Sequence, residues 1–265
     1  MRFKDKVVWI TGAGTGIGEG LAKAFAEEGA QLVLSSRTME ELEQVNDWCR
    51  KNNTEFLSIP FDMEIHDNYQ DLVGQVISRF GHIDVLVNNA GISQRAFSHE
   101  TDPAVIRKIM EINFFSAVQL TLPVLPLMLA QENGSVAVTS SISGIFGFPT
   151  RSAYSASKHA LSGFFETMGM ELRPKNIFVT LAYPGRINTG ISLNALQKDG
   201  TAWGKMDKAQ QNGISVEACA RKYLDAIYKR RRTVYIGGRE LLMVCFKHYL
   251  PWLFYRLASR LDPNA

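Results

Sequence analysis

A tyrosine and a lysine stand four residues apart in the segment SAYSASKHAL (152–161). The segment has a helical period, which places Tyr154 and Lys158 on one face of the helix. A phenol has a reference pKa of about 10, and a nearby ammonium lowers that pKa. The pair is therefore suited to protonate a carbonyl oxygen, or to accept the proton in the reverse reaction. The same spacing also occurs with a packed ring and a solvated amine, so other residues must decide.

A serine and a glycine-rich run add two further pieces of such chemistry. Ser141 ends a predicted strand, at the sheet edge where open α/β folds bind ligands, and its hydroxyl is suited to hold a substrate oxygen. The run TGAGTGIG (11–18) follows the apolar stretch VVWI, and its spacing is T-G-x-x-x-G-x-G rather than the common G-x-G-x-x-G. Glycines there let the backbone approach a pyrophosphate at a helix N-terminus. Such a turn also occurs simply to pack a strand on a helix.

The end of the second predicted strand bears on the choice of cofactor. A dinucleotide loop is ordinarily followed, about 20 residues on, by an acidic residue that binds the ribose hydroxyls. Here the strand ends in LVLSSR, without an acid. Ser36 and Arg37 are instead suited to bind a phosphate oxygen. We therefore expect a preference for NADP(H), with NAD(H) as the other nicotinamide cofactor, unless Arg37 is only a solvated loop residue.

These residues need a scaffold, and apolar runs alternate with helical segments along the whole chain. Continuous apolar strands in strict alternation with helices predict an α/β fold, with a parallel sheet of about seven strands and helices on both faces. Gly29 and Gly81 end two helices, and Thr38 with Glu41 predicts a capping box. The expected strands are 6–10, 31–36, 55–60, 83–91, 134–141, 177–185 and 233–236. The expected helices are 19–28, 38–51, 67–80, 103–129, 154–173 and 215–231.

The composition narrows the functional class. A net charge of +3, with basic residues spread along the 265-residue chain, argues against a nucleic-acid partner. Three separated cysteines and scattered histidines predict neither a disulfide framework nor a metal site. The cysteine pattern favours a reducing cytoplasm, and the absence of an apolar leader and of an uninterrupted apolar span argues against secretion and against a spanning helix. The nearest approach to a span lies in ELLMVCFKHYLPWLFYRL (240–257), which Lys247, His248 and Pro251 interrupt.

In combination, six motifs resemble those of the short-chain dehydrogenases/reductases, in that family's order and spacing. They are TGxxxGxG (11–18), NNAG (88–91), Asn113, Ser141, Tyr-x-x-x-Lys (154–158) and PGRINT (184–189). The resemblance covers about residues 5–238. The overall pattern of the chain is similar to that of the steroid- and retinoid-type, membrane-associated branch of the family. It implies a three-layer, doubly wound Rossmann fold and an oxidoreductase that interconverts a ketone or aldehyde and an alcohol.

The resemblance also implies a role for each matching residue. Tyr154 would be the acid/base, Lys158 would lower its pKa and bind the nicotinamide ribose, Ser141 would orient the substrate carbonyl, and Asn113 would hold a water in the proton relay. The cofactor residues it implies are Thr11, Gly12, Thr15, Gly16, Ile17, Gly18, Ser36, Arg37, Asp62, Asn88, Ala90, Gly91, Tyr154, Lys158, Pro184, Gly185, Ile187 and Thr189. One departure is Thr15, because many NADP-preferring members carry a basic residue there. The preference for NADP(H) therefore depends mainly on Ser36 and Arg37.

The later part of the chain bears on the substrate. Within one domain (1–238), the loop at about 186–214 folds over the substrate in the resembling family. Its apolar side chains predict a bulky apolar substrate, unless they are ordinary core residues. The candidate substrate residues are Ser141, Ser143, Phe146, Phe148 and Ile191.

The extension 239–265 is expected to be helical. Its apolar aromatics with Lys247, Arg256 and Arg260 suit a bilayer surface, or burial against this domain or a second subunit of a homodimer or homotetramer. Two other functions remain open. A dehydratase or epimerase on the same scaffold also uses Tyr-x-x-x-Lys, although such relatives tend to be longer. A cofactor-binding or membrane-docking protein without turnover would not need the set Ser141, Tyr154 and Lys158.

Overall fold

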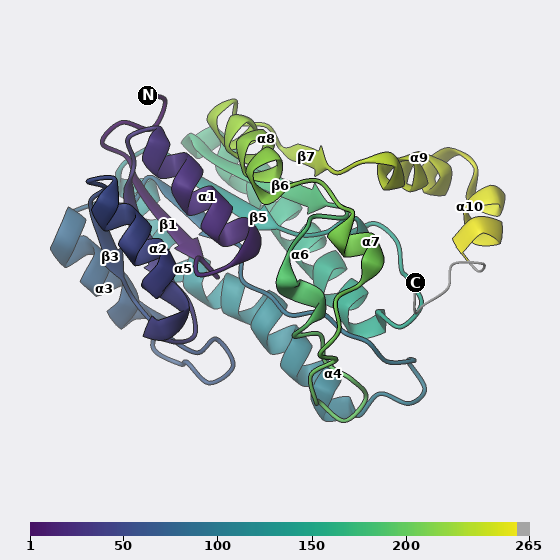
Figure 1. The fold of residues 1–265 in the computed structure, drawn as a ribbon. Helices are drawn as coiled ribbons and strands as arrows, with labels where there is room; N and C mark the ends of the chain where they lie inside the picture. Colours follow the sequence, from purple (N-terminus) through teal and green to yellow (C-terminus); the bar gives the residue numbers. More distant parts are fainter. Residues whose placement is uncertain (259–265) are drawn as a thin grey trace.

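In a computed structural model of the protein, residues 1–258 are described. One seven-stranded parallel sheet forms its centre, in the order β3-β2-β1-β4-β5-β6-β7 (Figure 1). The predicted α/β, doubly wound fold is therefore confirmed, and all seven predicted strands are present. The strands are β1 Val7–Thr11, β2 Gln31–Ser35, β3 Phe56–Ser58, β4 Val85–Asn88, β5 Gly134–Thr139, β6 Ile177–Pro184 and β7 Thr233–Ile236.

Helices cover both faces of this sheet, because its central strands are buried throughout and need apolar cover on each side. On one face α1, α2 and α8 pack around Leu21, Phe25 and Tyr223. On the other face α3, α5 and α6 pack around Leu120 and Phe165. The helices are α1 Gly16–Glu27, α2 Met39–Lys51, α3 Tyr69–Phe80, α4 Pro103–Met110, α5 Ser116–Ala130, α6 Ser152–Leu172, α7 Lys208–Gln211, α8 Val216–Tyr228, α9 Leu242–Tyr249 and α10 Pro251–Ala258.

The predicted capping box at the start of α2 is wrong. Thr38 is the N-cap residue, but its side chain makes no capping hydrogen bond. The carboxylate of Glu41 turns instead toward the end of β2, where it accepts hydrogen bonds from Ser36 and Arg37. A charged donor and a hydroxyl compete successfully with a single backbone N–H for this carboxylate. The predicted glycine at the end of α3 is confirmed, because Gly81 adopts the left-handed conformation at φ 79°.

The helical region predicted at 103–129 contains a π-helical turn. Residues Glu111–Phe115 form this turn between α4 and α5, and it carries Asn113. Residues Pro103–Ala130 also meet the length and hydropathy criterion for a membrane span, with a mean hydropathy of 1.6, which inspection of the sequence did not anticipate. A core helix meets the same criterion, and this one buries Leu120, Val124 and Met128 against the sheet.

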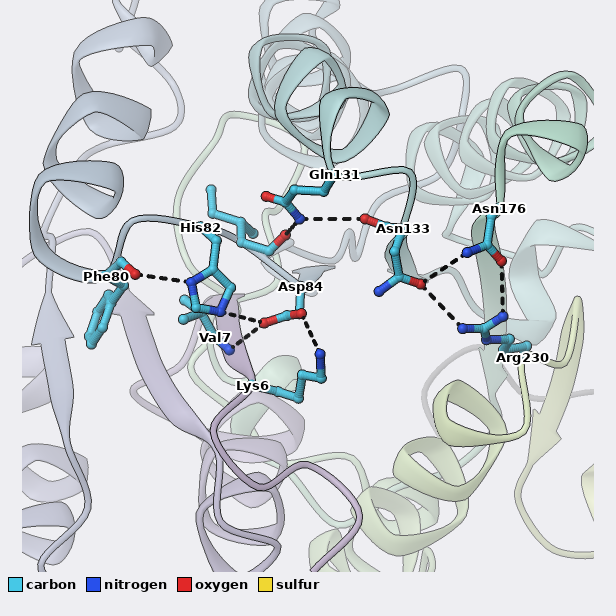
Figure 2. Close-up of polar contacts among 10 residues, drawn as sticks. Lys6, Val7, Phe80, His82, Asp84, Gln131, Asn133, Asn176 and Arg230 are labelled. Carbon is cyan, nitrogen blue, oxygen red and sulfur yellow. Dashed lines mark hydrogen bonds and ion pairs between the residues drawn. The ribbon is translucent and has the colours of Figure 1, made fainter.

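The amino-terminal edge of the sheet is closed by polar contacts (Figure 2). Asp84, which precedes β4, is 7% exposed and accepts hydrogen bonds from the Lys6 ammonium and the Val7 backbone N–H, both at 2.9 Å. The carboxylate oxygen that accepts from Val7 also lies 3.0 Å from Nε2 of His82, and Lys6 donates to the other oxygen. Arg230, which follows α8, contacts the side chains of Asn133 and Asn176. These contacts join the strand starts on the side opposite the strand ends.

The helices α9 and α10 extend beyond the last strand and pack on the loop that follows β5 (Figure 1). Phe254 of α10 lies 4.9 Å, between ring centroids, from Phe146, and both rings are buried. Within the described part, the predicted C-terminal extension is therefore helical and contacts its own domain. Residues 259–265, including Arg260, lie outside the described residues.

Candidate active site

A cleft with a volume of about 1660 Å³ opens at the carboxyl ends of β1, β4, β5 and β6. The strand order reverses between β1 and β4, which is where open α/β sheets bind their ligands. Most of the predicted site residues line this one cleft. They are Gly12, Thr15, Gly16, Ile17, Ser36, Arg37, Asp62, Ala90, Gly91, Ser141, Ser143, Phe148, Tyr154, Lys158, Pro184, Gly185, Ile187, Thr189 and Ile191.

The glycine loop is held close to the chain that follows β4. Gly12 has a φ of +62°, and a Cβ there would lie 2.9 Å from the Cα of Ala90. Gly18 packs directly on the carbonyl oxygen of Gly12, so a Cβ would overlap it. The hydroxyl of Thr11 accepts hydrogen bonds from the backbone N–H groups of Asn89 and Ala90, at 3.0 and 3.1 Å. Only glycine permits these approaches, which bring the loop and the start of α1 to the cleft.

At the far end of the cleft, the carboxylate of Glu41 accepts hydrogen bonds from Ser36 and Arg37, the two residues that were predicted to bind a phosphate. The hydroxyl of Ser36 donates to Glu41 at 2.5 Å, and Nη2 of Arg37 donates to it at 2.7 Å. Partial burial raises the pKa of Glu41, but the hydrogen bonds from Ser36 and Arg37 outweigh it and lower that pKa overall. A negative charge therefore sits between the two predicted phosphate ligands.

The helix α6 brings Lys158 close to the ring of Tyr154. Lys158 is 3% exposed, and its ammonium donates to the carbonyl oxygen of Thr139 at 2.8 Å. The same nitrogen lies 5.7 Å from the centroid of the Tyr154 ring. Burial lowers the pKa of Lys158 to about 8. A Cβ at Gly91 would come within 3.3 Å of this ammonium, so the glycine leaves room for it.

The side chains of Tyr154 and Ser141 lie within hydrogen-bonding contact in the lining of the cleft. Burial raises the pKa of the Tyr154 phenol, while a hydrogen bond with Ser141 and the charge of Arg151 act in the opposite direction. The hydroxyl of Ser141 accepts a hydrogen bond from the N–H of Ser143 at 3.1 Å. This arrangement holds a protonated phenol beside a serine hydroxyl, as carbonyl reduction requires.

Asn113 lies behind this pair rather than in the lining of the cleft. Its side-chain oxygen accepts the N–H of Ile92 at 2.8 Å, and its side-chain nitrogen donates to the carbonyl of Ile92 at 3.0 Å. The same nitrogen donates to the hydroxyl of Ser157 on α6 at 2.9 Å. The π-helical turn aims this side chain at both partners, so Asn113 joins α6 to the segment after β4.

Four other predicted residues do not line the cleft. The side chain of Asn88 points to the opposite side of β4, where it donates to Thr121 of α5 at 2.8 Å, and its neighbour Asn89 lines the cleft. Alternation along a strand gives adjacent residues opposite faces, which explains the exchange. Phe146 is buried against α10. Thr11 and Gly18 also lie behind the lining, where they support the loop.

The first turn of α6 is capped by a residue that the sequence did not single out. Gln94 is fully buried, and its side-chain oxygen accepts the N–H groups of Ala153 at 2.7 Å and Tyr154 at 3.4 Å. These are donors that a helix N-terminus leaves without intrahelical partners. Gln94 lies nearly 60 residues before α6 in the chain, so no local pattern reveals the contact. It fixes the backbone of Tyr154.

Three charged residues that were likewise not predicted gather beside Tyr154. Arg95, Arg151 and Asp207 all line the cleft, and their side chains are 9%, 15% and 12% exposed. Both guanidinium groups contact the same carboxylate oxygen of Asp207. Burial and the neighbouring Arg95 lower the pKa of Arg151 to about 10.

The loop after β6 forms the remaining wall of the cleft. Gln210 of α7 donates to the carbonyl of Ile187 at 2.7 Å, which holds the loop inward. Glu240, at the start of the C-terminal extension, accepts the N–H of Arg186 at 2.8 Å. Apolar side chains of this loop that line the cleft are Ile191, Leu193, Leu196, Trp203 and Met206. Among residues 1–258, no group of three or more histidine, cysteine or acidic side chains is placed to hold a metal ion.

Comparison with known proteins identifies relatives of this chain. The profile of a family described as short chain dehydrogenase matches residues 6–200. The chain is 37% identical over 265 residues to dehydrogenase/reductase SDR family member 7B of Bos taurus, covering 97% of this chain and 82% of that protein. It is 41% identical over 274 residues to dehydrogenase/reductase SDR family protein 7-like of Anopheles gambiae, covering 98% and 85%.

Solved structures show the same architecture. A short-chain dehydrogenase/reductase from Burkholderia phymatum in complex with NAD superposes with a TM-score of 0.84 at 24% identity, covering 100% of this chain and 98% of that one. Levodione reductase superposes with a TM-score of 0.79 at 28% identity, covering 89% and 97%. The likeness to the Burkholderia protein shows that the fold is shared, and the sequence relatives show the family to which the chain belongs.

Proposed function

The chain belongs to the short-chain dehydrogenase/reductase family of oxidoreductases, and from this premise we propose that it reduces a ketone or aldehyde with NADP(H), or oxidises the corresponding alcohol. The observation that carries the proposal is the convergence of Ser141, Tyr154 and Lys158 on a cleft that begins at a glycine loop. A protein that only binds a nucleotide has no need of this proton-transfer set.

The residues present fit a nicotinamide dinucleotide. The cleft is large enough for a cofactor and a substrate together, and it runs past the N-terminus of α1, where backbone N–H groups favour a pyrophosphate. At Gly16 a Cβ would come within 3.1 Å of Thr189, so glycine leaves the space between the two loops open. When bound, the cofactor supplies or accepts the hydride.

The proton is handled by this chain's own side chains. We assign Tyr154 as the acid that protonates the carbonyl oxygen, and Ser141 as the donor that orients that oxygen. Once an oxyanion or phenolate forms, the buried ammonium of Lys158 stabilises it, because a charge in a poorly solvated site acts strongly on its neighbours. Asn113 holds α6 against the segment after β4, and we assign it a water that returns the proton from solvent.

The test of this mechanism is Tyr154→Phe, which removes the acidic hydroxyl and keeps the ring. We expect NADPH oxidation to fall by at least about a hundredfold, the usual contribution of a general acid, while NADPH affinity changes only a few fold. Tyr228→Phe, on the distant helix α8, is the matched control. Undiminished activity of Tyr154→Phe would refute the mechanism. Cofactor binding without turnover of any carbonyl by the unaltered protein would favour a binding function.

For the cofactor, we propose that Ser36 and Arg37 bind the 2′-phosphate of NADP(H). The support is their position at the end of β2 in the lining of the cleft. Arg37→Ala should weaken NADPH binding by about tenfold or more and NADH binding by less than about threefold, because the phosphate is the only group that differs. Arg50→Ala, on α2 outside the cleft, controls for the loss of positive charge. Equal losses for NADPH and NADH would refute the assignment.

For the substrate, we propose a bulky and largely apolar molecule. The support is the apolar wall formed by the loop after β6, in which Ile191, Leu196 and Trp203 line the cleft. NADPH oxidation with steroids, retinoids, aromatic diketones and short aldehydes tests this proposal. Short aldehydes should have the lowest kcat/KM, and a preference for them would contradict it.

We further propose that α9 and α10 rest on an anionic bilayer surface. The exposed side chains Leu242, Trp252 and Tyr255 lie in a segment that also carries Lys247 and Arg256, a composition that suits an interfacial helix. Flotation with phosphatidylcholine vesicles, with and without phosphatidylserine, tests the contact. Trp252→Glu should abolish flotation and leave the sedimentation coefficient unchanged. If instead it converts a dimer into a monomer, the surface is a subunit contact.

A further inference from the structure

The arginine pair beside Tyr154 has no part in the mechanism above. Arg95 comes from the segment after β4, Arg151 immediately precedes α6, and Asp207 precedes α7. All three side chains are mostly buried and line the cleft that holds Tyr154. From this juxtaposition we propose that the substrate carries an anionic group, a carboxylate or a phosphate, which Arg95 and Arg151 bind. The proposal rests on the proposed function and narrows its substrate class to amphipathic carbonyl compounds.

Backbone hydrogen bonds hold the two segments that carry Arg95 and Arg151. The N–H of Arg95 donates to the carbonyl of Leu196 at 2.7 Å, and the N–H of Ala96 donates to the carbonyl of Thr150 at 3.2 Å. The guanidinium of Arg151 also donates to the backbone carbonyl of Gln94. Three distant segments thus meet at a fixed point on the cleft wall. Preorganised arginines of this kind suit carboxylate and phosphate groups, whose oxygens accept two parallel hydrogen bonds.

The local charge favours an additional anion. Arg95 and Arg151 contact one and the same oxygen of Asp207. Lys205 and Lys208, two exposed residues close to Asp207 in the chain, also line the cleft. Asp207 compensates only part of this charge, because burial and Arg95 still hold the pKa of Arg151 below its ordinary value. A ligand anion would offset the remaining desolvation of Arg151.

The position of Arg151 also limits where the anion lies on the substrate. Arg151 precedes Tyr154 by three residues, and its charge acts on the pKa of the Tyr154 phenol. Because Arg151 and Tyr154 lie three residues apart and line the same cleft, we place the anionic group near the carbonyl that Tyr154 protonates. The apolar wall that contains Leu196 and Trp203 remains for the rest of the molecule. The expected substrate is a long-chain ketone with a carboxylate or phosphate close to its carbonyl.

Two matched substrate pairs test the proposal. One pair is 1-hydroxy-2-dodecanone and its phosphate monoester, and the other is the methyl ester of 4-oxododecanoic acid and the free acid. With NADPH, the better of the two anions should exceed its neutral partner in kcat/KM by about tenfold or more, chiefly through a lower KM. The pair with the larger ratio distinguishes phosphate from carboxylate. Equal kcat/KM within both pairs would overturn the proposal.

Variants separate a binding role from a structural one. Arg151→Gln should lower kcat/KM for the anionic substrate by about tenfold and for its neutral partner by less than about threefold. Asp207→Asn removes the competing carboxylate and should lower KM for the anion, a change of opposite sign. Lys175→Gln, at an exposed site after α6, is the control for charge. Equal losses for both substrates in Arg151→Gln, with no gain in Asp207→Asn, would show that the arginines only brace the loop.

A measurement without turnover distinguishes failure of this proposal from failure of the proposed function. With NADPH present, octyl phosphate or octanoate should raise the melting temperature, octanol should not, and Arg151→Gln should abolish the effect. An anion-dependent shift without reduction of any carbonyl would overturn the oxidoreductase and leave the anion site standing. Reduction of the neutral ketones without any preference for an anion would overturn the anion site alone.

Discussion

The contact of Glu41 with Ser36 and Arg37 leads to a prediction about the cofactor. In the proposed function these two residues bind the 2′-phosphate of NADPH, so the phosphate must compete with a carboxylate that is already there. Glu41→Gln keeps the size of the side chain and removes its charge. We expect the variant to bind NADPH more tightly and NADH nearly as before, because NADH lacks the phosphate.

The structure sets the size of this effect. The pair formed by Arg37 and Glu41 is weak, because the Arg37 side chain is 67% exposed and solvent screens it, so it contributes roughly 0–1 kcal/mol. The hydrogen bond from Ser36 to the carboxylate is charge-assisted and less exposed, and it contributes about 1.5 kcal/mol. In Glu41→Gln the side-chain amide oxygen still accepts hydrogen bonds, so part of the Arg37 and Ser36 contributions persists. A net gain of about 1 kcal/mol remains, which corresponds to about fivefold in the dissociation constant.

Titration of NADPH and NADH against the intrinsic fluorescence of the protein measures both dissociation constants. Glu43→Gln is the matched control, because Glu43 lies on the same helix and pairs with Arg50 at 3.0 Å, away from the cleft. The reasoning would be refuted if Glu41→Gln weakened NADPH binding, or if it changed NADPH and NADH by the same factor. Either result would mean that Glu41 positions the loop or binds the ribose rather than competing with a phosphate.

Three further predictions concern the helix α6 and the scaffold. Burial lowers the pKa of Lys158 from 10.5 to about 8, so the folded protein releases this proton first and gains stability as the pH rises from about 8 to about 10.5. Denaturant titrations measure the free energy of unfolding of the wild type and of Lys158→Met. The wild-type value minus the variant value should rise by about 2 kcal/mol between pH 8 and pH 10, and a constant difference would contradict this. Gln94→Leu leaves N–H groups at the start of α6 without their acceptor, so it should lower the free energy of unfolding by about 2 kcal/mol. It should also lower kcat, with a smaller change in the KM for NADPH. Gln94→Glu should restore kcat, and a loss of stability with unchanged kcat would exclude a role in positioning Tyr154. Asp84→Asn weakens the contacts opposite the cleft and should lower stability by about 1–2 kcal/mol without changing either KM, which thermal unfolding and steady-state kinetics measure.

Much of this protein is determined by local sequence. The central strands are apolar runs between polar or glycine-containing turns, and such runs are buried in a parallel sheet. The four-residue spacing of Tyr154 and Lys158 and the glycine loop before α1 are likewise readable, because a helix and a strand–helix turn impose these periods. The general position of the cleft follows, since parallel strands end at a common edge.

The tertiary structure alone decides which side chains meet at that edge. Glu41 was predicted to cap α2, but it turns to Ser36 and Arg37, because their donors stabilise a carboxylate better than one N–H does. Asn88 faces α5 instead of the cleft, and a register of one residue makes that difference. Gln94 reaches α6 across nearly 60 residues of chain. The contacts of Asn88 and Gln94 join groups distant in sequence, so they depend on how helices and loops pack, and no local period encodes them.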